Sequence, residues 1–116
     1  MPRVLLLEDD PLVLMILSLE LQADGLDVLQ AETVAEAIAL LGEGPDVLVC
    51  DLDLRDRCDA YDLARIARAR NPALGVVYAS GVARPEFVDR KVAGGVLAPK
   101  PFLDQEIVRR VRALLA

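Results

Sequence analysis

Short apolar runs along this chain alternate with longer segments in which apolar residues recur at helical spacing. The central run, 47–50, ends at an acid, Asp51, and its length and β-branched content are typical of a strand buried on both faces. Comparable runs predict the other strands, at 3–7, 26–30, 75–79 and 96–98. Such strands belong to a parallel sheet that is covered by helices on both sides.

Helix signals fill the intervals between these runs. Asp10 before Pro11 is typical of an N-cap and a first helical position, and Thr33 with Glu36 forms a capping box. The helices are predicted at 11–23, 33–41, 60–70, 85–92 and 105–115. Five alternations of strand and helix predict an α/β fold, (βα)5, with helices on both faces of one doubly wound parallel sheet.

The composition narrows the classes of function. With 116 residues, 54% of them apolar, the chain is expected to fold as one domain, 1–116. A net charge of −6 argues against nucleic-acid binding, and the absence of histidine excludes Ser-His-Asp catalysis, Cys-His catalysis and His-ligated zinc. Two cysteines, Cys50 and Cys58, are too few for a disulfide framework. Neither a signal-peptide pattern nor a run of ~18 apolar residues is present, so we expect a cytoplasmic protein with no membrane partner.

Polar residues follow four of the predicted strands. In a parallel sheet the carboxyl ends share one edge, which is where ligands bind in this class of fold. One cluster is therefore expected from Glu8, Asp9, Asp51, Asp53, Ser80 and Lys100. An acid after a strand is usually a helix cap or part of a solvated loop, but the coincidence of four such positions favours a site.

This cluster combines carboxylates with one lysine and one hydroxyl. Neighbouring carboxylates repel one another, and a hard divalent cation that takes oxygen ligands relieves the repulsion. We expect this cation to be Mg²⁺, with Mn²⁺ as a substitute. Lys100 adds a positive charge suited to a phosphoryl oxygen, and Ser80 can donate a hydrogen bond to the same group. Asp51 is therefore the predicted phosphoacceptor. Because no histidine or well-placed glutamate would activate water, the acyl phosphate is expected to persist as a signal.

Over nearly its whole length the sequence resembles the receiver domain of two-component response regulators. The family's motifs are matched by Glu8-Asp9, Asp51, Ser80-Gly81 and Lys100-Pro101, with Phe102 behind the last pair. The resemblance implies a flavodoxin-like sheet of strand order 2-1-3-4-5. It also implies that Mg²⁺ is bound by Asp9, the Asp51 carboxylate and the backbone carbonyl of Asp53, with Glu8 acting directly or through water.

The same resemblance implies a role in signalling. A histidine kinase or a histidine phosphotransfer protein would phosphorylate Asp51 in a Mg²⁺-dependent phosphorelay, and Ser80, Gly81 and Lys100 would bind the phosphoryl group. The activity would be limited to Mg²⁺-dependent self-phosphorylation and slow autodephosphorylation, so we do not expect an enzyme in the usual sense. Because the last predicted helix runs to the end of the chain, we expect a stand-alone receiver that acts by contact with an unknown target protein.

Three positions depart from the family pattern. Arg55 stands where proline is usual, Asp59 where glycine is usual, and Leu97 where an aromatic switch residue is usual. Because leucine has no ring to rotate inward, we expect only small changes in the fourth helix and fifth strand on phosphorylation.

Two other functions fit part of the sequence. The segment from Asp51 to Asp53 also resembles the Asp-x-Asp nucleophile motif of haloacid-dehalogenase-type phosphohydrolases, but that family carries it on the first strand of a larger chain with a cap. A receiver that binds partners without being phosphorylated is the second alternative. Retention of the acids, Ser80 and Lys100 argues against it.

The first predicted helix has two apolar stripes on opposite sides. The stripe predicted to face the sheet contains Val13, Leu17 and Leu21, with Leu14 at its edge. The other stripe is formed by Leu12, Met15, Ile16 and Leu19. Either this second stripe packs on the last helix or remains as scattered surface residues, or it docks a helix of the phosphodonor or a second copy of the chain.

Overall fold

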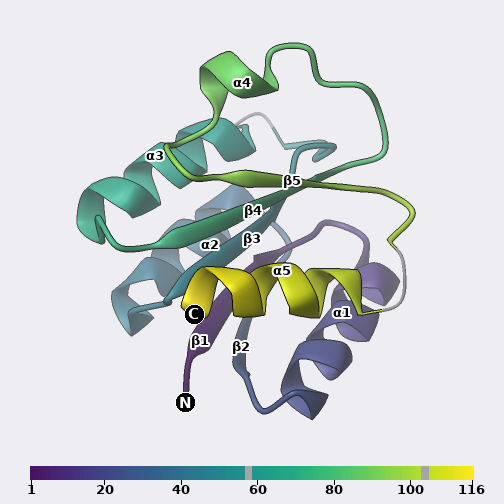
Figure 1. Cartoon of the computed structure of the whole chain (residues 1–116), viewed down its shortest axis with the longest axis vertical. Coiled ribbons are helices and arrows are strands. Elements are labelled where there is room, and N and C mark those ends of the chain that lie inside the picture. Colours follow the sequence, from purple (N-terminus) through teal and green to yellow (C-terminus); the bar gives the residue numbers. More distant parts are fainter. Residues whose placement is uncertain (57–58, 103–104) are drawn as a thin grey trace.

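The computed structural model describes residues 1–56, 59–102 and 105–116, and Cys58 lies outside this part of the chain. One sheet contains five parallel strands in the order β2-β1-β3-β4-β5 (Figure 1). The elements are β1 (Arg3–Leu7), α1 (Pro11–Ala23), β2 (Asp27–Ala31), α2 (Val34–Leu40), a 3₁₀ turn (Leu41–Glu43), β3 (Val47–Asp51), α3 (Ala60–Arg70), β4 (Gly75–Ser80), α4 (Phe87–Arg90), β5 (Val96–Pro99) and α5 (Glu106–Leu115). The predicted flavodoxin-like α/β fold is confirmed.

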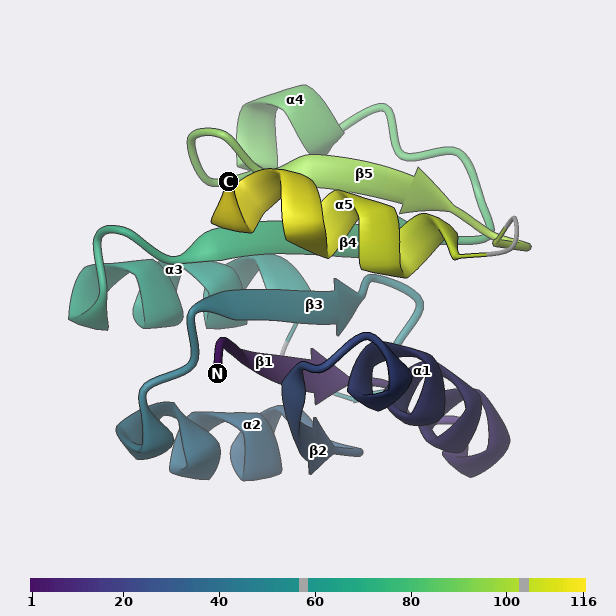
Figure 2. The same cartoon turned by 60° about the horizontal axis from the view of Figure 1, so that its bottom comes forward.

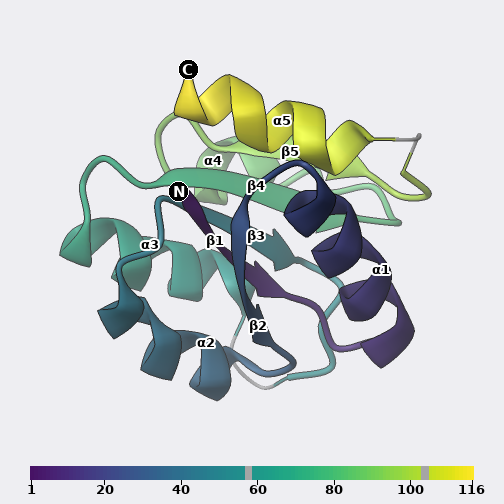
Figure 3. The same ribbon diagram turned by 90° about the horizontal axis from the view of Figure 1, so that it is seen from below.

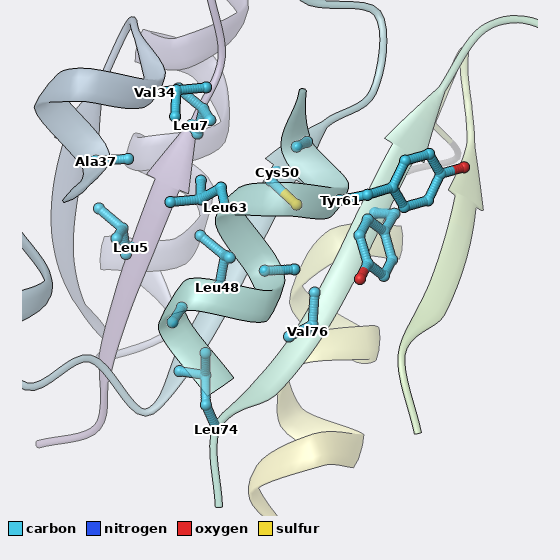
Figure 4. Packing of buried hydrophobic residues seen from close by; sticks show 14 of the residues in the cluster. Leu5, Leu7, Val34, Ala37, Leu48, Cys50, Tyr61, Leu63, Leu74 and Val76 are labelled. Carbon is cyan, nitrogen blue, oxygen red and sulfur yellow. The ribbon is translucent and has the colours of Figure 1, made fainter. Parts of the chain in front are cut away.

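Helices cover both faces of the sheet because successive residues of a strand point to opposite sides. On one face, Leu5, Leu48 and Val76 pack against α2 and α3 (Figure 4). On the other face, Val4 and Val49 pack against α1 and α5, which lie on the opposite side of the sheet from α2 and α3 (Figure 3). A strand buried on both faces is almost wholly apolar, which is why the apolar runs located the strands.

Side-chain caps fix where three helices begin. Asp10 accepts hydrogen bonds from backbone N–H groups in the first turn of α1, and Thr33 does the same for α2. Asp59, which stands at a position where the family usually has glycine, accepts the N–H of Asp62 at 2.8 Å and caps α3. The departure at this position therefore provides a helix start.

The largest difference from the predicted elements is α4. A helix was expected over 85–92, but α4 is a single turn that contains no buried residue. Phe87 packs against the core from the side, whereas Val88 is 77% exposed. Val92, at the end of the expected range, is buried in the same core, but it lies beyond Lys91, whose backbone is extended, so the helical turn itself packs through Phe87.

All five strands run in one direction, so their carboxyl ends and the loops that follow lie at one edge of the sheet. The arrowheads of β1, β3 and β5 in Figure 2 point toward this edge. Within residues 1–56, 59–102 and 105–116, no helix has the length and apolar character needed to cross a lipid bilayer.

Candidate functional site

Four strands bring the predicted site residues to one edge. Asp51 is the last residue of β3 and Ser80 the last of β4, and both are buried. Glu8 follows β1 directly, and Lys100 follows β5. Parallel pairing of β1 with β3, of β3 with β4 and of β4 with β5 is what makes residues so distant in sequence neighbours in space.

Three of the predicted acids form a compact cluster. One carboxylate oxygen each from Glu8, Asp9 and Asp51 lies within 4.8 Å of the others. Glu8 and Asp51 are buried, whereas Asp9 is half-buried, accepts the N–H of Arg55 at 3.1 Å and lines a groove of about 500 Å³. Oxygen donors with one side open to solvent fit Mg²⁺, which retains water or phosphate oxygens among its ligands.

Burial and charge set the protonation of Glu8. Burial, and then a hydrogen bond and charge repulsion from Asp51, raise the pKa of Glu8 to about 8. Lys100 acts in the opposite direction, with its Nζ 3.4 Å from Glu8 Oε1 and 3.1 Å from Asp51 Oδ2. At neutral pH and without a metal, Glu8 therefore holds a proton.

Lys100 stays charged in this setting. Burial by itself lowers the pKa of Lys100, but the charge of Asp51 and the hydrogen bond to it, followed by the charges that Glu8 and Asp53 carry at alkaline pH, outweigh burial and raise the pKa. The ammonium group therefore remains a positive charge in contact with the predicted phosphoacceptor.

The Asp53 carboxylate binds groups of β4 and the loop after it. Its Oδ1 accepts the hydroxyl of Ser80 at 2.8 Å, and its Oδ2 accepts the N–H of Gly81 at 2.7 Å. An ion pair with Arg84 adds a third partner. Burial raises the pKa of Asp53, but these donors and the charge of Lys100 outweigh it and lower the pKa. The metal-ligand role expected of the Asp53 backbone carbonyl stays a prediction.

Arg84 is a site residue that the sequence did not reveal. Its Nε donates to Ser80 Oγ at 3.0 Å, and its Nη2 donates to the carbonyl oxygen of Leu52 at 2.9 Å. The guanidinium thereby connects the end of β3 to the loop 81–86. An arginine in a polar loop carries no pattern that would predict this contact, because the contact depends on the path of the loop.

Leu97, at the expected switch position, lies half-buried in β5 beside Tyr78. The aromatic rings of this region come from other elements: the rings of Tyr78 and Phe87 meet edge to face with centroids 5.3 Å apart. Tyr61 of α3 donates its hydroxyl to Glu86 at 2.7 Å. The residues around α4 are therefore joined to α3 independently of position 97.

The second apolar stripe of α1 lies at the surface. Its four side chains, which we call the α1 patch, are between 46% and 60% exposed: Leu12, Met15, Ile16 and Leu19. The residues buried against the sheet are Leu14, Leu17, Ser18 and Leu21, with Val13 half-buried. Within the described residues, the α1 patch is therefore not part of the buried cluster that α1 forms with α5. A groove of about 470 Å³ lined by Val13, Gly81, Lys100, Pro101 and Phe102 links α1 to the site.

Comparison with known proteins identifies the family. A model described as the response regulator receiver domain matches residues 4–112. The chain belongs to the response regulator receiver domain family. This receiver domain is similar to a solved response regulator receiver protein from Sinorhizobium medicae, with a TM-score of 0.92 and 29% identity, covering 98% of this chain and 94% of that one. The family match also rules out the haloacid-dehalogenase interpretation of the Asp-x-Asp segment.

Curated relatives are longer than this receiver domain. The transcriptional regulatory protein TrcR of Mycobacterium tuberculosis is 35% identical over 118 residues, which cover 97% of this chain and 45% of that protein. The transcriptional regulatory protein CpxR of Klebsiella pneumoniae is 28% identical over 115 residues, which cover 99% of this chain and 50% of that protein. The chain thus spans about half the length of these relatives. Receiver domains are phosphoacceptor signalling domains and take phosphate from histidine kinases.

Proposed function

We propose that this receiver domain accepts a phosphoryl group on Asp51 from a histidine kinase or a histidine phosphotransfer protein. The observation that carries this proposal is the position of Lys100, whose Nζ lies 3.1 Å from Asp51 Oδ2 beside a cluster of three carboxylates. A buried carboxylate with a cation on one side and further oxygen donors on the other has the arrangement that phosphoryl transfer needs. Output then occurs through contact with a target protein.

In the transfer step an oxygen of the Asp51 carboxylate forms a bond to phosphorus. The bond from phosphorus to the donor breaks, and its electron pair leaves with the donor nitrogen of a phosphohistidine or the donor oxygen of an acyl phosphate. Lys100 contributes a positive charge near the oxygens of the incoming group. The Ser80 hydroxyl and the Gly81 N–H are the neutral donors on the side of β4.

We propose that Glu8, Asp9 and Asp51 hold Mg²⁺, with the backbone carbonyl of Asp53 as a further ligand and Mn²⁺ as a substitute metal. The bound metal would neutralise carboxylate and phosphoryl charge during transfer. The mutual approach of three carboxylate oxygens within 4.8 Å supports this assignment. Because Glu8 holds a proton at neutral pH without metal, binding should release that proton.

Intact mass spectrometry tests the phosphoacceptor. After incubation with acetyl phosphate and Mg²⁺, the wild-type chain should gain the mass of one phosphoryl group, and it should gain much less when a chelator replaces Mg²⁺. Asp51→Asn should abolish the gain. Asp46→Asn is the matched control because Asp46 lies directly before the first residue of β3, at the end of the strand away from Asp51. This variant should be phosphorylated normally. Equal phosphorylation of Asp51→Asn and wild type would show that the assignment is wrong.

We also propose that the α1 patch receives a helix of the phosphodonor. Its apolar side chains lie on the helix that begins beside the acid cluster, and the groove lined by Gly81, Lys100 and Phe102 continues from α1 toward Asp51. A contiguous exposed apolar surface next to a reaction centre suits a partner whose reactive group must approach that centre.

A double variant, Met15→Glu with Leu19→Glu, tests the docking surface. It should keep its fold and still accept phosphate from acetyl phosphate, because both side chains are exposed. It should lose transfer from a protein donor or, if the occupant is a second copy, lose self-association. Val88→Glu is the matched control, since Val88 is an exposed apolar residue of α4. Unfolding of the double variant, or unchanged transfer together with unchanged association, would contradict the proposal.

A further inference from the structure

Ser80 and Gly81 already have an anionic partner in this structure. The Ser80 hydroxyl lies 2.8 Å from Asp53 Oδ1 and 3.0 Å from the carbonyl oxygen of Val82, and the shorter contact is with the charged acceptor. The Gly81 N–H donates to Asp53 Oδ2 at 2.7 Å. These are the two neutral donors that a phosphoryl group on Asp51 would use. A hydroxyl carries one hydrogen, so Ser80 cannot donate to Asp53 and to a phosphoryl oxygen at the same time.

The third donor is also close to Asp53. Lys100 Nζ lies 3.1 Å from Asp51 Oδ2 and 3.9 Å from Asp53 Oδ2, so one ammonium group faces both carboxylates. A carboxylate that accepts charge-assisted hydrogen bonds on both of its oxygens has the acceptor chemistry of two oxygens of a phosphoryl group. Asp53 therefore resembles the expected ligand in the sign of its charge and in its two acceptor oxygens.

Arg84 holds the Asp53 carboxylate in this position. The guanidinium forms an ion pair with Asp53 and also donates to Ser80 Oγ and to the carbonyl oxygen of Leu52. Because Leu52 directly follows the last residue of β3, the guanidinium is anchored at the edge of the sheet. The side chains of Asp53 and Arg84 are only 27% and 24% exposed, so water competes weakly for their contact.

We propose that Asp53 is an internal competitor for the phosphoryl-binding donors Ser80 and Gly81, and that phosphorylation of Asp51 displaces its carboxylate from them. The inference rests on the proposed function of Asp51. The exchange breaks no covalent bond: the carboxylate keeps Arg84 and gains water, while the two donors turn to phosphoryl oxygens. The site thus binds a phosphoryl group less tightly than its donors alone would allow.

A titration with beryllofluoride in the presence of Mg²⁺ tests this inference, with amide NMR of the full chain as the readout. Asp53→Ala should reach half-saturation at a beryllofluoride concentration at least about tenfold lower than wild type, because the two competing hydrogen bonds to Ser80 and Gly81 are together worth no less than one charge-assisted hydrogen bond, which corresponds to roughly that factor. In the free proteins, the Gly81 amide proton should move upfield in Asp53→Ala, since it loses a carboxylate acceptor 2.7 Å away. In the bound proteins the two Gly81 resonances should coincide.

Two further variants separate the contact from charge and from folding. Asp53→Asn keeps the shape of the side chain and should give a smaller decrease in the half-saturation concentration, so the test does not depend on the folding of the alanine variant. Glu32→Gln removes one exposed negative charge after β2 at the same edge of the sheet and should leave half-saturation within about twofold of wild type.

The outcomes distinguish this inference from the proposed function. If wild type binds beryllofluoride and both Asp53 variants bind it with unchanged half-saturation, the proposed competition by Asp53 is wrong, whereas the phosphoacceptor role of Asp51 is not affected. An equal gain in affinity for Glu32→Gln and Asp53→Ala would also overturn it, because general charge would then explain the effect. If neither wild type nor any variant binds beryllofluoride, the proposed function is wrong, and the proposed competition by Asp53 is wrong with it.

Discussion

Glu8 should make the metal-free protein less stable as the pH rises from 5 to 8. In the folded protein, burial and the proximity of Asp51 raise the pKa of Glu8 to about 8, whereas its ordinary value is 4.5. Between these two values the folded chain holds a proton that the unfolded chain has lost. Stability therefore falls with increasing pH across this interval and levels off above it. The chain contains no histidine, so no imidazole titrates in the same interval.

The size of the effect follows from the two pKa values. Each pKa unit corresponds to about 1.4 kcal/mol, so a change from 4.5 to about 8 amounts to at most about 5 kcal/mol at pH 8 and about 3 kcal/mol at pH 7. Glu8 is only 3% exposed, so solvent screens little of this. For a small domain with a total stability of about 5–15 kcal/mol, this is a large fraction.

Urea unfolding in a chelator, from pH 5 to pH 9 at constant ionic strength, measures this dependence. The wild-type midpoint should fall with pH, whereas Glu8→Gln, which keeps the shape of the side chain without a titrating group, should change little. The variant should be the more stable protein at pH 8 and close to wild type at pH 5. Glu32→Gln, at an exposed position, should retain the wild-type pH dependence. A wild-type midpoint that stays constant or rises between pH 5 and pH 8, at unchanged m-value, would refute the reasoning.

Three other predictions concern the metal, the switch and Arg84. Excess Mg²⁺ should raise the melting temperature more at pH 8 than at pH 6, because Glu8 must lose its proton to bind metal. The same melting temperature in chelator and in excess Mg²⁺ would count against a metal site. Beryllofluoride should cause only small amide shifts in α4 and β5, because Leu97 has no ring to rotate; NMR shifts there as large as those around Asp51 would contradict this. Arg84→Ala should lower the free energy of unfolding by about 1–2 kcal/mol in urea titrations, because Asp53 loses a part-buried charged donor; an unchanged midpoint would show that the ion pair adds nothing.

The strands and the acid cluster could be predicted from the sequence because both depend on short, local patterns. A strand buried on both faces must be apolar throughout, as in 47–50, and the first polar residue after it marks the edge of the sheet. Parallel pairing then brings Glu8, Asp51 and Lys100 together without any knowledge of the loops. The caps at Asp10 and Thr33 are local in the same sense.

The direction of the Asp53 side chain could not be predicted in this way. Asp53 lies two residues beyond the end of β3, so its carboxylate follows the loop, and it meets Ser80, Gly81 and Arg84 because the loop after β4 folds back over it. No periodicity relates residues of two loops. The length of α4 could not be predicted from the sequence either, because Val92 reaches the core from extended backbone beyond Lys91 rather than from a continued helix.

The contacts around α4 limit how much of the structure rearranges when the Asp53 carboxylate is displaced. A helix of one turn is not stable alone, so its position depends on its neighbours. Tyr61 donates to Glu86 at 2.7 Å, and Arg90 binds Asp59 at 2.7 Å, so α4 and the residue before it are attached to the first turn of α3 and its cap. Neither contact involves the site.

The loop 81–86 is attached to the site at one end and to these contacts at the other. When the Asp53 carboxylate leaves Ser80 and Gly81, the two donors change partners, but Arg84 keeps both the Asp53 carboxylate and the carbonyl oxygen of Leu52, which directly follows β3. The rearrangement is therefore expected to stay within Asp53, Ser80 and the loop 81–86. Because Gly81 also lines the groove that begins at α1, the surface altered by phosphorylation borders the α1 patch. A partner bound along that groove would contact a surface that differs between the phosphorylated and unphosphorylated forms. It would therefore distinguish the two forms without the rotation of an aromatic ring at position 97.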